Sequence, residues 1–480
     1  MSISCKWSNA IINKIRNYKA LTERGSKEAR EKVLSLMEEV LKEVDAGKRI
    51  HELMCLNGDI LTVGERKWDL RKKKNIYLIG AGKACNAMAQ AVCEILGERI
   101  TRGIISVKIA EPQDHYVNTD VYIGGHPLPN AEGMAAAQKM LELIDSAGED
   151  DLFISVISGG SSALITCPIE GITLEDEILA QKLLLESGAK ISEINAVRRH
   201  ISRTNGGRLA ERILGRGSEL ISLIVSDGVG PSTQLQSERK KPAKFFGTPM
   251  APDGTMIEDA RKMIENYDLS EKLPRSITAF LMDDERVRET PKSFDDKGDK
   301  FVIYILGAVA DSCEEAVRIA GKMGIPILVL STFMEGESRE SGYFISSVVR
   351  EAYYRGRPVC PPCYIVFSGE TTTAIQSQPK GMGGPSQELV LGFCIGIRGL
   401  EGVAGASIDT EGTDGTTPYA GGLVDGGTFQ ALEQCGVSVY EALRGHSAGN
   451  ALEKIGDNIM TGNTGTNLCD FNVFYISKCR

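Results

Sequence analysis

Short apolar runs alternate with amphipathic segments along most of the chain. Ile76–Ile79, Phe153–Ile157 and Leu220–Val225 are nearly continuous apolar runs, and each is followed by glycine or serine. Such runs are typical of strands buried on both faces of a parallel sheet. Between them, apolar residues repeat at helical spacing, for example over Ser26–Val44 and Asn130–Ile144. The alternation predicts a three-layer α/β architecture.

The same alternation restarts after a charged and polar stretch at 291–300, which we interpret as the domain junction. Val302–Leu306 is predicted to be the first strand of the second half, and Tyr364–Phe367 a later one. We therefore predict one domain over residues 1–290 and a second over residues 291–480. The pattern assigns no role to an extra N-terminal segment at 1–35.

Composition narrows the function classes without pointing to one. The chain has 480 residues, long enough for two or three domains with substantial cores. Its net charge of -9 argues against nucleic-acid binding, because no basic excess is present to neutralise phosphates, although a local site can still bind a small anion. No apolar run is long enough to span a bilayer, and the N-terminus lacks a signal-peptide pattern. The 12 cysteines are therefore expected to be reduced thiols of a cytoplasmic protein.

Two glycine-rich loops that follow predicted strands form the clearest candidate site. Glycines at the carboxyl end of a strand let backbone N–H groups turn toward an anion, and hydroxyls add donors. The loop after Ile157 has this composition: Ser158, Gly159, Gly160, Ser161 and Ser162. In the other loop, Lys83 lies at a helix start, where a cation is electrostatically misplaced unless it meets an anion. A tight turn with polar filler and a solvated lysine are the alternatives.

Basic and acidic positions add two further candidates. Asn195 and Arg198 share one face of a predicted basic helix, where cations could bind a carboxylate or phosphate. A solvated basic helix is the alternative. Asp227, Glu370 and Asp414 each follow a predicted strand beside glycine. Acids in that position are typical Mg²⁺ ligands in phosphoryl transfer, but Asp-Gly pairs are also common in turns.

Taken together, ten motifs resemble the glycerate 2-kinase family with a C-terminal MOFRL domain, in the family's order and over residues 40–475. These are GAGKA (80–84), GGHPLPN (124–130), SGGSSAL (158–164), GITLEDEI (171–178), INAVRRHIS (194–202), GGRLA (206–210), RGRPVCPP (355–362), SGETT (368–372), GTDGTTPYAGGLVDGGT (412–428) and TGNTGTNLCD (461–470). The resemblance implies two three-layer α/β domains, a Rossmann-like N-terminal domain and a smaller MOFRL domain, with the active site in the cleft between them.

The resemblance also implies an activity and a set of site residues. The family phosphorylates the 2-hydroxyl of D-glycerate, a small organic acid, with ATP and Mg²⁺, giving 2-phosphoglycerate. By resemblance the catalytic residues would be Lys83, Arg198 and Asp227, and the substrate would contact His126, Asn195 and the loop Ser158–Ser162. The nucleotide would contact Glu370, Thr371, Thr413, Asp414 and Gly415, and the metal would be held by Asp227, Glu370 and Asp414. A homodimer remains an open alternative.

One departure from the family pattern keeps two other functions open. The family has a GGRNQE segment whose arginine the resemblance implies to be catalytic, and this chain has Pro385 in its place. Proline supplies neither the charge nor the donors of arginine. A family member that binds an organic acid or nucleotide without turnover is therefore an alternative. A hydroxypyruvate reductase is a weaker one, because Cys85 replaces the third glycine of the dinucleotide fingerprint.

Overall fold

The computed structural model describes residues 13–112, 114–229, 249–375 and 379–478. These residues form two compact units. The first unit contains residues 49–226 and 249–306, and the second contains residues 13–48, 227–229 and the chain from 307 onward. The boundary predicted between residues 290 and 291 coincides with none of the junctions of these units, because the strand Phe301–Gly307 extends the first unit and the helix Lys27–Glu43 belongs to the second.

The first unit is built on a six-stranded sheet with the strand order β6-β5-β4-β7-β8-β9. Its strands are β4 (Ile76–Ala81), β5 (Arg102–Val107), β6 (Thr119–Ile123), β7 (Leu152–Ile157), β8 (Glu219–Val225) and β9 (Phe301–Gly307). All residues of β4 and β7 are buried, which explains their continuous apolar sequence. The pairs β4–β5, β5–β6, β4–β7 and β7–β8 are parallel. The predicted strand at 302–306 therefore forms, but as the last strand of this sheet rather than the first strand of a new domain.

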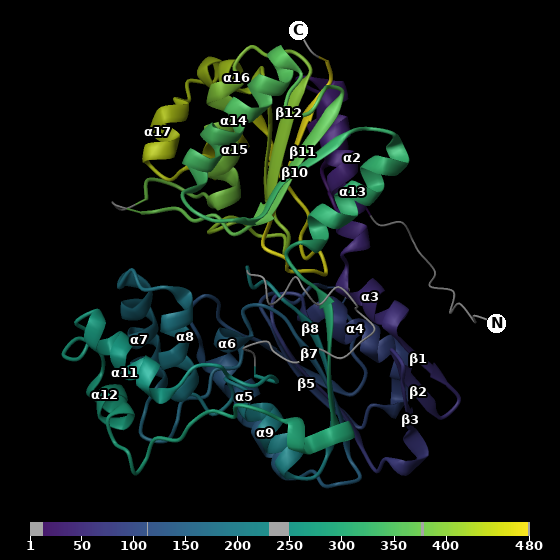
Figure 1. Ribbon diagram of the computed structural model, residues 1–480, viewed down its shortest axis with the longest axis vertical. Coiled ribbons are helices and arrows are strands. Elements are labelled where there is room, and N and C mark those ends of the chain that lie inside the picture. Colours follow the sequence, from purple (N-terminus) through teal and green to yellow (C-terminus); the bar gives the residue numbers. More distant parts are fainter. Residues whose placement is uncertain (1–12, 113, 230–248, 376–378, 479–480) are drawn as a thin grey trace. The chain divides into compact units, whose positions relative to one another are not determined.

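Helices pack against this sheet and around a second, smaller core (Figure 1). The helices that contact the strands are α4 (Cys85–Leu96), α5 (Ala131–Asp145), α6 (Ser161–Leu164) and α9 (Arg208–Gly215). The second core is formed by α7 (Leu174–Glu186), α8 (Ile191–His200), α11 (Ile257–Asn266) and α12 (Arg275–Leu281). A small antiparallel sheet follows α3 (Ala46–Leu53) and comprises β1 (Met54–Asn57), β2 (Ile60–Val63) and β3 (Arg66–Asp69).

The second unit has a mixed six-stranded sheet in the order β10-β11-β15-β12-β13-β14. Its strands are β10 (Ile327–Met334), β11 (Cys363–Gly369), β12 (Val403–Asp409), β13 (Gly421–Asp425), β14 (Asn458–Ile459) and β15 (Asp470–Ile476). One face is covered by α15 (Pro385–Gly396), which in turn packs on α14 (Ser338–Arg355). The other elements at this end of the chain are α13 (Asp311–Met323), α16 (Thr428–Gln434), α17 (Val439–Arg444) and α18 (Ala448–Ile455).

The N-terminal helices belong to this second unit and complete its three layers. After the short α1 (Tyr18–Thr22), the helix α2 (Lys27–Glu43) packs on β12, β15 and α13, on the sheet face opposite α15. Apolar side chains such as Val33, Leu36 and Val40 are fully buried there. The part of the 1–35 segment that the structure describes thus includes the start of a helix that covers the C-terminal sheet.

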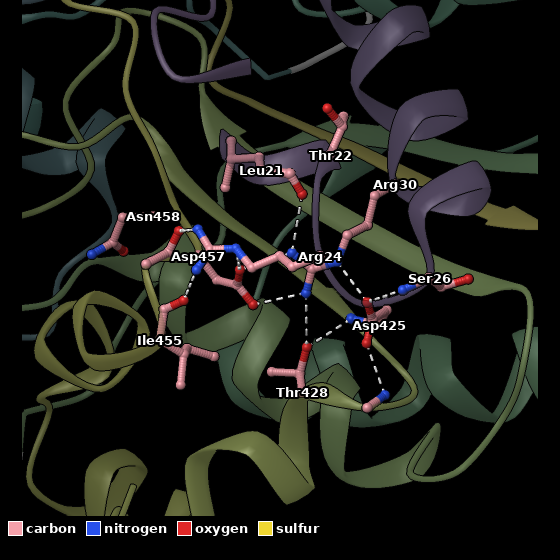
Figure 2. A network of polar contacts seen from close by, with 12 residues as sticks. Leu21, Thr22, Arg24, Ser26, Arg30, Asp425, Thr428, Ile455, Asp457 and Asn458 are labelled. Carbon is pink, nitrogen blue, oxygen red and sulfur yellow. Dashed lines mark hydrogen bonds and ion pairs between the residues drawn. The ribbon is translucent and has the colours of Figure 1, made fainter. Parts of the chain in front are cut away.

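A buried ion-pair network fixes α2 to this unit (Figure 2). Arg30 donates from Nη1 and Nη2 to the two oxygens of Asp457, at 2.8 Å each, and from Nε to Asp425 Oδ2 at 2.5 Å. All three residues are 2% exposed. Arg24 donates to the carbonyls of Ile455 and Gly456. Burial by itself would lower the pKa of Arg30, but its bonds to Asp457 and Asp425 outweigh that effect and raise it.

Replacing Arg30 by methionine should destabilise the protein strongly. The substitution keeps much of the side-chain volume, but it leaves the buried Asp425 carboxylate without its cation and Asp457 with only Arg24, at 3.4 Å. Breaking a buried pair in this way typically costs about 3–5 kcal/mol. The measurement is the free energy of unfolding from urea denaturation. Arg71→Met is the matched control, because Arg71 pairs with Asp69 at an exposed position, and this substitution should leave the free energy of unfolding nearly unchanged. Equal losses in the two variants would contradict the role given to the network.

Candidate functional site

The glycine-rich loops after β4 and β7 lie side by side at the centre of the first sheet. From β4 the chain proceeds through β5 and β6 toward one edge, and from β7 through β8 toward the other. The carboxyl ends of β4 and β7 therefore mark the point at which the strand order reverses. In open α/β sheets, ligands bind in the crevice outside the strand ends at such a point.

The two loops are held together by backbone contacts that only glycine permits. Gly82 has φ +133, and a Cβ there would lie 2.1 Å from Ser158 Oγ and 2.6 Å from the Ser158 carbonyl oxygen. The N–H of Lys83 donates to the carbonyl of Gly159 at 3.0 Å, and the N–H of Ala84 donates to Ser158 Oγ at 2.9 Å. Ser158 is thus a structural partner of the first loop.

Lys83, Gly160 and His126 converge at this place. Gly160 has φ +85, and a Cβ built on it would lie 2.9 Å from His126 Cδ2 and 3.2 Å from Lys83 Cγ. The side chains of Lys83 and His126 are half-buried, so each is shielded in part from water. The structure therefore brings together three of the positions predicted from sequence, a lysine, a histidine and the serine–glycine loop, within one unit.

Two polar residues of α7 are buried, and one of them supports the loop that carries His126. Gln181 is 5% exposed, and its Nε2 donates to the carbonyl of Pro127, next to His126, at 2.6 Å. Glu177, one helical turn earlier, is 6% exposed; burial raises its pKa, with Thr166 and Arg198 acting in the opposite direction. Reasoning from sequence missed both residues. The only local hint is their spacing of four residues, which places both on one helix face, but it does not show that this face is covered.

Arg198 and Asn195 lie on α8, in the second core of the first unit. Arg198 Nη1 donates to Asn195 Oδ1 at 3.3 Å. Burial lowers the pKa of Arg198, and the nearby Glu177 carboxylate partly restores it. The asparagine that contacts the serine loop is Asn205, whose Nδ2 donates to the Ser162 carbonyl at 3.3 Å. Sequence reasoning passed over Asn205, although it lies in the same basic segment.

The acidic residues predicted in the second half divide into two groups. Asp227 and Glu370 lie around Cys469, whose Sγ is 3.0 Å from the Asp227 carbonyl and 4.0 Å from Glu370 Oε2. Burial raises the pKa of the Cys469 thiol, and Glu370 and Asp227 raise it further. Thr371 donates from N and Oγ1 to Asp470 Oδ2, at 3.1 and 3.0 Å, beside the same strand end.

Asp414, the third acidic residue, caps a helix. It is 1% exposed and accepts hydrogen bonds from the N–H groups of Ser386 and Gln387, at 3.1 and 2.8 Å, and so caps the start of α15. Burial raises its pKa, Asp470 adds to this, and the two N–H donors act in the opposite direction. Of its neighbours, Thr413 donates to Glu411 Oε1 at 2.7 Å. Gly415 has φ +58 and packs on the Gly383 carbonyl.

Within the described part of the chain, no cluster of three or more His, Cys, Asp or Glu side chains is arranged to hold a metal ion. Asp227, Glu370 and Asp414 therefore do not form one ligand set here. The ten cysteines described are all free thiols, and none of the described helices is long and apolar enough to cross a bilayer.

The fold and the strand-end loops define an α/β protein with a doubly wound N-terminal unit and a mixed-sheet C-terminal unit. Residues 32–282 match the model of a domain of unknown function, DUF4147, and residues 363–470 match the MOFRL family. The glycerate 2-kinase of Pyrococcus horikoshii is 38% identical over 453 residues, covering 94% of this chain and 98% of that protein. The D-glycerate 2-kinase of Thermotoga maritima is 35% identical over 82% of this chain and 89% of its own length.

A solved structure agrees with these matches. A crystal structure of a glycerate kinase from Thermotoga maritima superposes with a TM-score of 0.71 at 32% identity, covering 92% of this chain and 99% of that one. A relative in Agrobacterium vitis, 32% identical over 85% of this chain and 88% of its own length, is named provisionally as a hydroxypyruvate reductase. The chain belongs to the glycerate kinase family, and the resemblance seen in its motifs is confirmed.

Substituting Gly82 by alanine should disrupt the candidate site. The new Cβ would overlap Ser158, and alanine disfavours the backbone conformation at φ +133, so we expect a loss of about 2–4 kcal/mol in the free energy of unfolding. The measurement is again urea denaturation. Gly148→Ala is the control, since a Cβ there meets no atom within 4 Å, and it should stay within about 0.5 kcal/mol of the parent. A Gly82→Ala protein of parental stability would show that the loops are not interlocked as described.

Proposed function

We propose that this chain transfers a phosphoryl group from ATP to the 2-hydroxyl of D-glycerate, giving 2-phosphoglycerate. The observation that carries the proposal is the convergence of Lys83, His126 and the Ser158–Ser162 loop where the strand order reverses. Relatives at 35–38% identity are named glycerate kinases, which supports this class of substrate. A small organic acid of this kind presents a carboxylate and hydroxyls, which match one cation and several hydroxyl donors.

The first unit would bind and orient the acid. The Lys83 ammonium would pair with the carboxylate or with the transferring phosphoryl group, in a half-buried position where water screens the charge less. The hydroxyls of Ser161 and Ser162, together with Asn195, would hydrogen-bond the substrate hydroxyls, and Arg198 would add a second cation. Gln181 and Glu177 would act as positioning residues, because they fix Pro127 and lie beside Arg198.

The second unit would supply the nucleotide and metal contacts. Magnesium usually needs one or two protein carboxylates in addition to substrate phosphates. Asp227 and Glu370 fit that need, because they surround one thiol and raise its pKa, a sign of local negative charge that a cation would neutralise. Asp414 fits poorly as a ligand, since it caps α15, and we assign it to positioning that helix. When bound, the metal would neutralise charge on the transferring phosphoryl group.

The test is a coupled assay of ADP release with glycerate, erythronate, threonate and tartronate. We expect turnover with glycerate, and a fall in kcat/KM of about 100-fold or more in Lys83→Met, because that charge acts where negative charge develops. Lys262→Met, at an exposed position, is the control and should retain parental rates. Inactivity of the parent with all four acids, or parental rates in Lys83→Met, would rule the proposal out.

Pro385 favours binding without turnover as the second candidate. It occupies the first position of α15, directly beside the Asp414 cap, and brings no charge there. If catalysis has been lost with the arginine, calorimetry should detect acid or nucleotide binding to an inactive parent, and Pro385→Arg should raise turnover by about tenfold or more. Pro274→Arg, next to the start of α12, is the control and should change nothing. Turnover in the parent that Pro385→Arg does not increase would support the kinase instead.

The reductase alternative has less support from the structure. In the dinucleotide fingerprint, the third glycine allows close packing of helix and strand. Here Cys85 fills that place, and its Sγ lies 2.8 Å from where a Cβ of Gly80 would be. Oxidation of NADH on adding hydroxypyruvate would nevertheless reverse this ranking.

A further inference from the structure

A cavity of about 620 Å³ lies in the second unit, away from the residues assigned above. It is formed by the turn after α16, by α17 and α18, and by Lys380; helices α16 and α17 are labelled in Figure 1. Its size is within the range of sites for small organic ligands, about 300–1,000 Å³. None of the residues of the proposed kinase function lines it.

The cavity is basic although the chain as a whole is acidic. Lys380, Arg444 and Lys454 line it, against a single carboxylate, that of Glu441. Over the ranges that the structure describes, no ion pair or side-chain hydrogen bond joins any of these three cations to a protein group. All three side chains are exposed, so water screens much of their mutual repulsion, but three cations around one hollow still favour a bound anion, and such a concentration stands out in a protein of net charge -9.

The neutral polar groups of the cavity add a donor and an acceptor. Asn450 Oδ1 accepts from the N–H of Met382 at 2.7 Å, which leaves the amide N–H₂ as the group that can bind a ligand. The hydroxyl of Ser447, on the same wall, donates to the Ala442 carbonyl at 3.3 Å and so offers a ligand its acceptor side. Point charges of lysine and the forked guanidinium of arginine together suit phosphate oxygens. We propose that this cavity binds a small organic phosphate that carries at least two negative charges.

The cavity also contacts the loop that leads into α15. The N–H of Lys380 donates to the Gly445 carbonyl at 2.8 Å, and Met382 is bonded to Asn450 as above. The loop continues through Gly383 and Gly384. A Cβ on Gly384 would lie 2.3 Å from the Asp414 carboxylate. A ligand that neutralises the cations would therefore also hold the loop that precedes Pro385.

The experiment is calorimetric titration of the full chain, in low salt and without metal, with a sugar bisphosphate and with inorganic pyrophosphate. We expect saturable binding of one bisphosphate, tighter than pyrophosphate because the sugar fills the remaining volume. The triple variant Lys380→Gln/Arg444→Gln/Lys454→Gln should bind about tenfold more weakly or worse. The control Lys262→Gln/Lys272→Gln/Arg275→Gln makes the same change in charge at exposed positions of the first unit and should bind as the parent does. Lys83→Met should also bind as the parent does, which separates this cavity from the proposed kinase site.

Lysine acetylation of the parent gives a second measurement that needs no variant. The bisphosphate should slow acetylation of Lys380 and Lys454 and leave Lys262 and Lys272 unchanged. Binding that survives the triple variant, absence of saturable binding, or absence of protection at both cavity lysines would overturn the proposal. Pyrophosphate that binds as tightly as the bisphosphate would overturn the organic part of it.

Discussion

The approach of Gly82 to Ser158 is the constraint on which the candidate site depends. Backbone atoms of the β4 and β7 loops can come this close only because residue 82 has no Cβ. Once the loops are joined, Lys83 is carried to Gly160, and the glycine there leaves room for the His126 ring. Charge, hydroxyls and imidazole are thus assembled by backbone packing at two strand ends, before any side-chain hydrogen bond is considered.

The Arg30 network plays the corresponding part in the second unit. A buried ion pair is weak evidence for added stability, because desolvation offsets much of its attraction, but breaking one is costly. Arg30 reaches Asp425 at the end of β13 and Asp457 just before β14, so it specifies where α2 docks on the sheet. Hydrophobic burial alone would allow α2 to pack in several neighbouring registers. The Arg30 guanidinium bonded to two carboxylates allows only one of them. This explains how residues far apart in sequence complete one domain.

Local patterns were enough to predict most strands and the two glycine loops, because those features depend on neighbours in sequence. The sheet that Phe301–Gly307 joins, the docking of α2 and the cap that Asp414 gives to α15 depend on partners far away in the chain. Apolar periodicity does not encode such partners. Gln181 and Glu177 were missed for a related reason, since a polar residue on a helix looks solvent-facing until the structure shows what covers it.

Pro385 is a favourable residue for starting helix α15, whatever its effect on catalysis. Proline is well suited to the first position of a helix, where its missing N–H has no helical partner and its fixed φ is already helical. An arginine there would place a cation at the positive end of the helix dipole, although the adjacent Asp414 carboxylate would offset part of that repulsion. The Asp414 carboxylate serves the N–H groups of Ser386 and Gln387 in either case. Proline at this position is therefore favourable for helix α15 on local grounds. Proline thus suits the start of α15, and the Asp414 carboxylate satisfies two N–H groups there that have no partner within the helix.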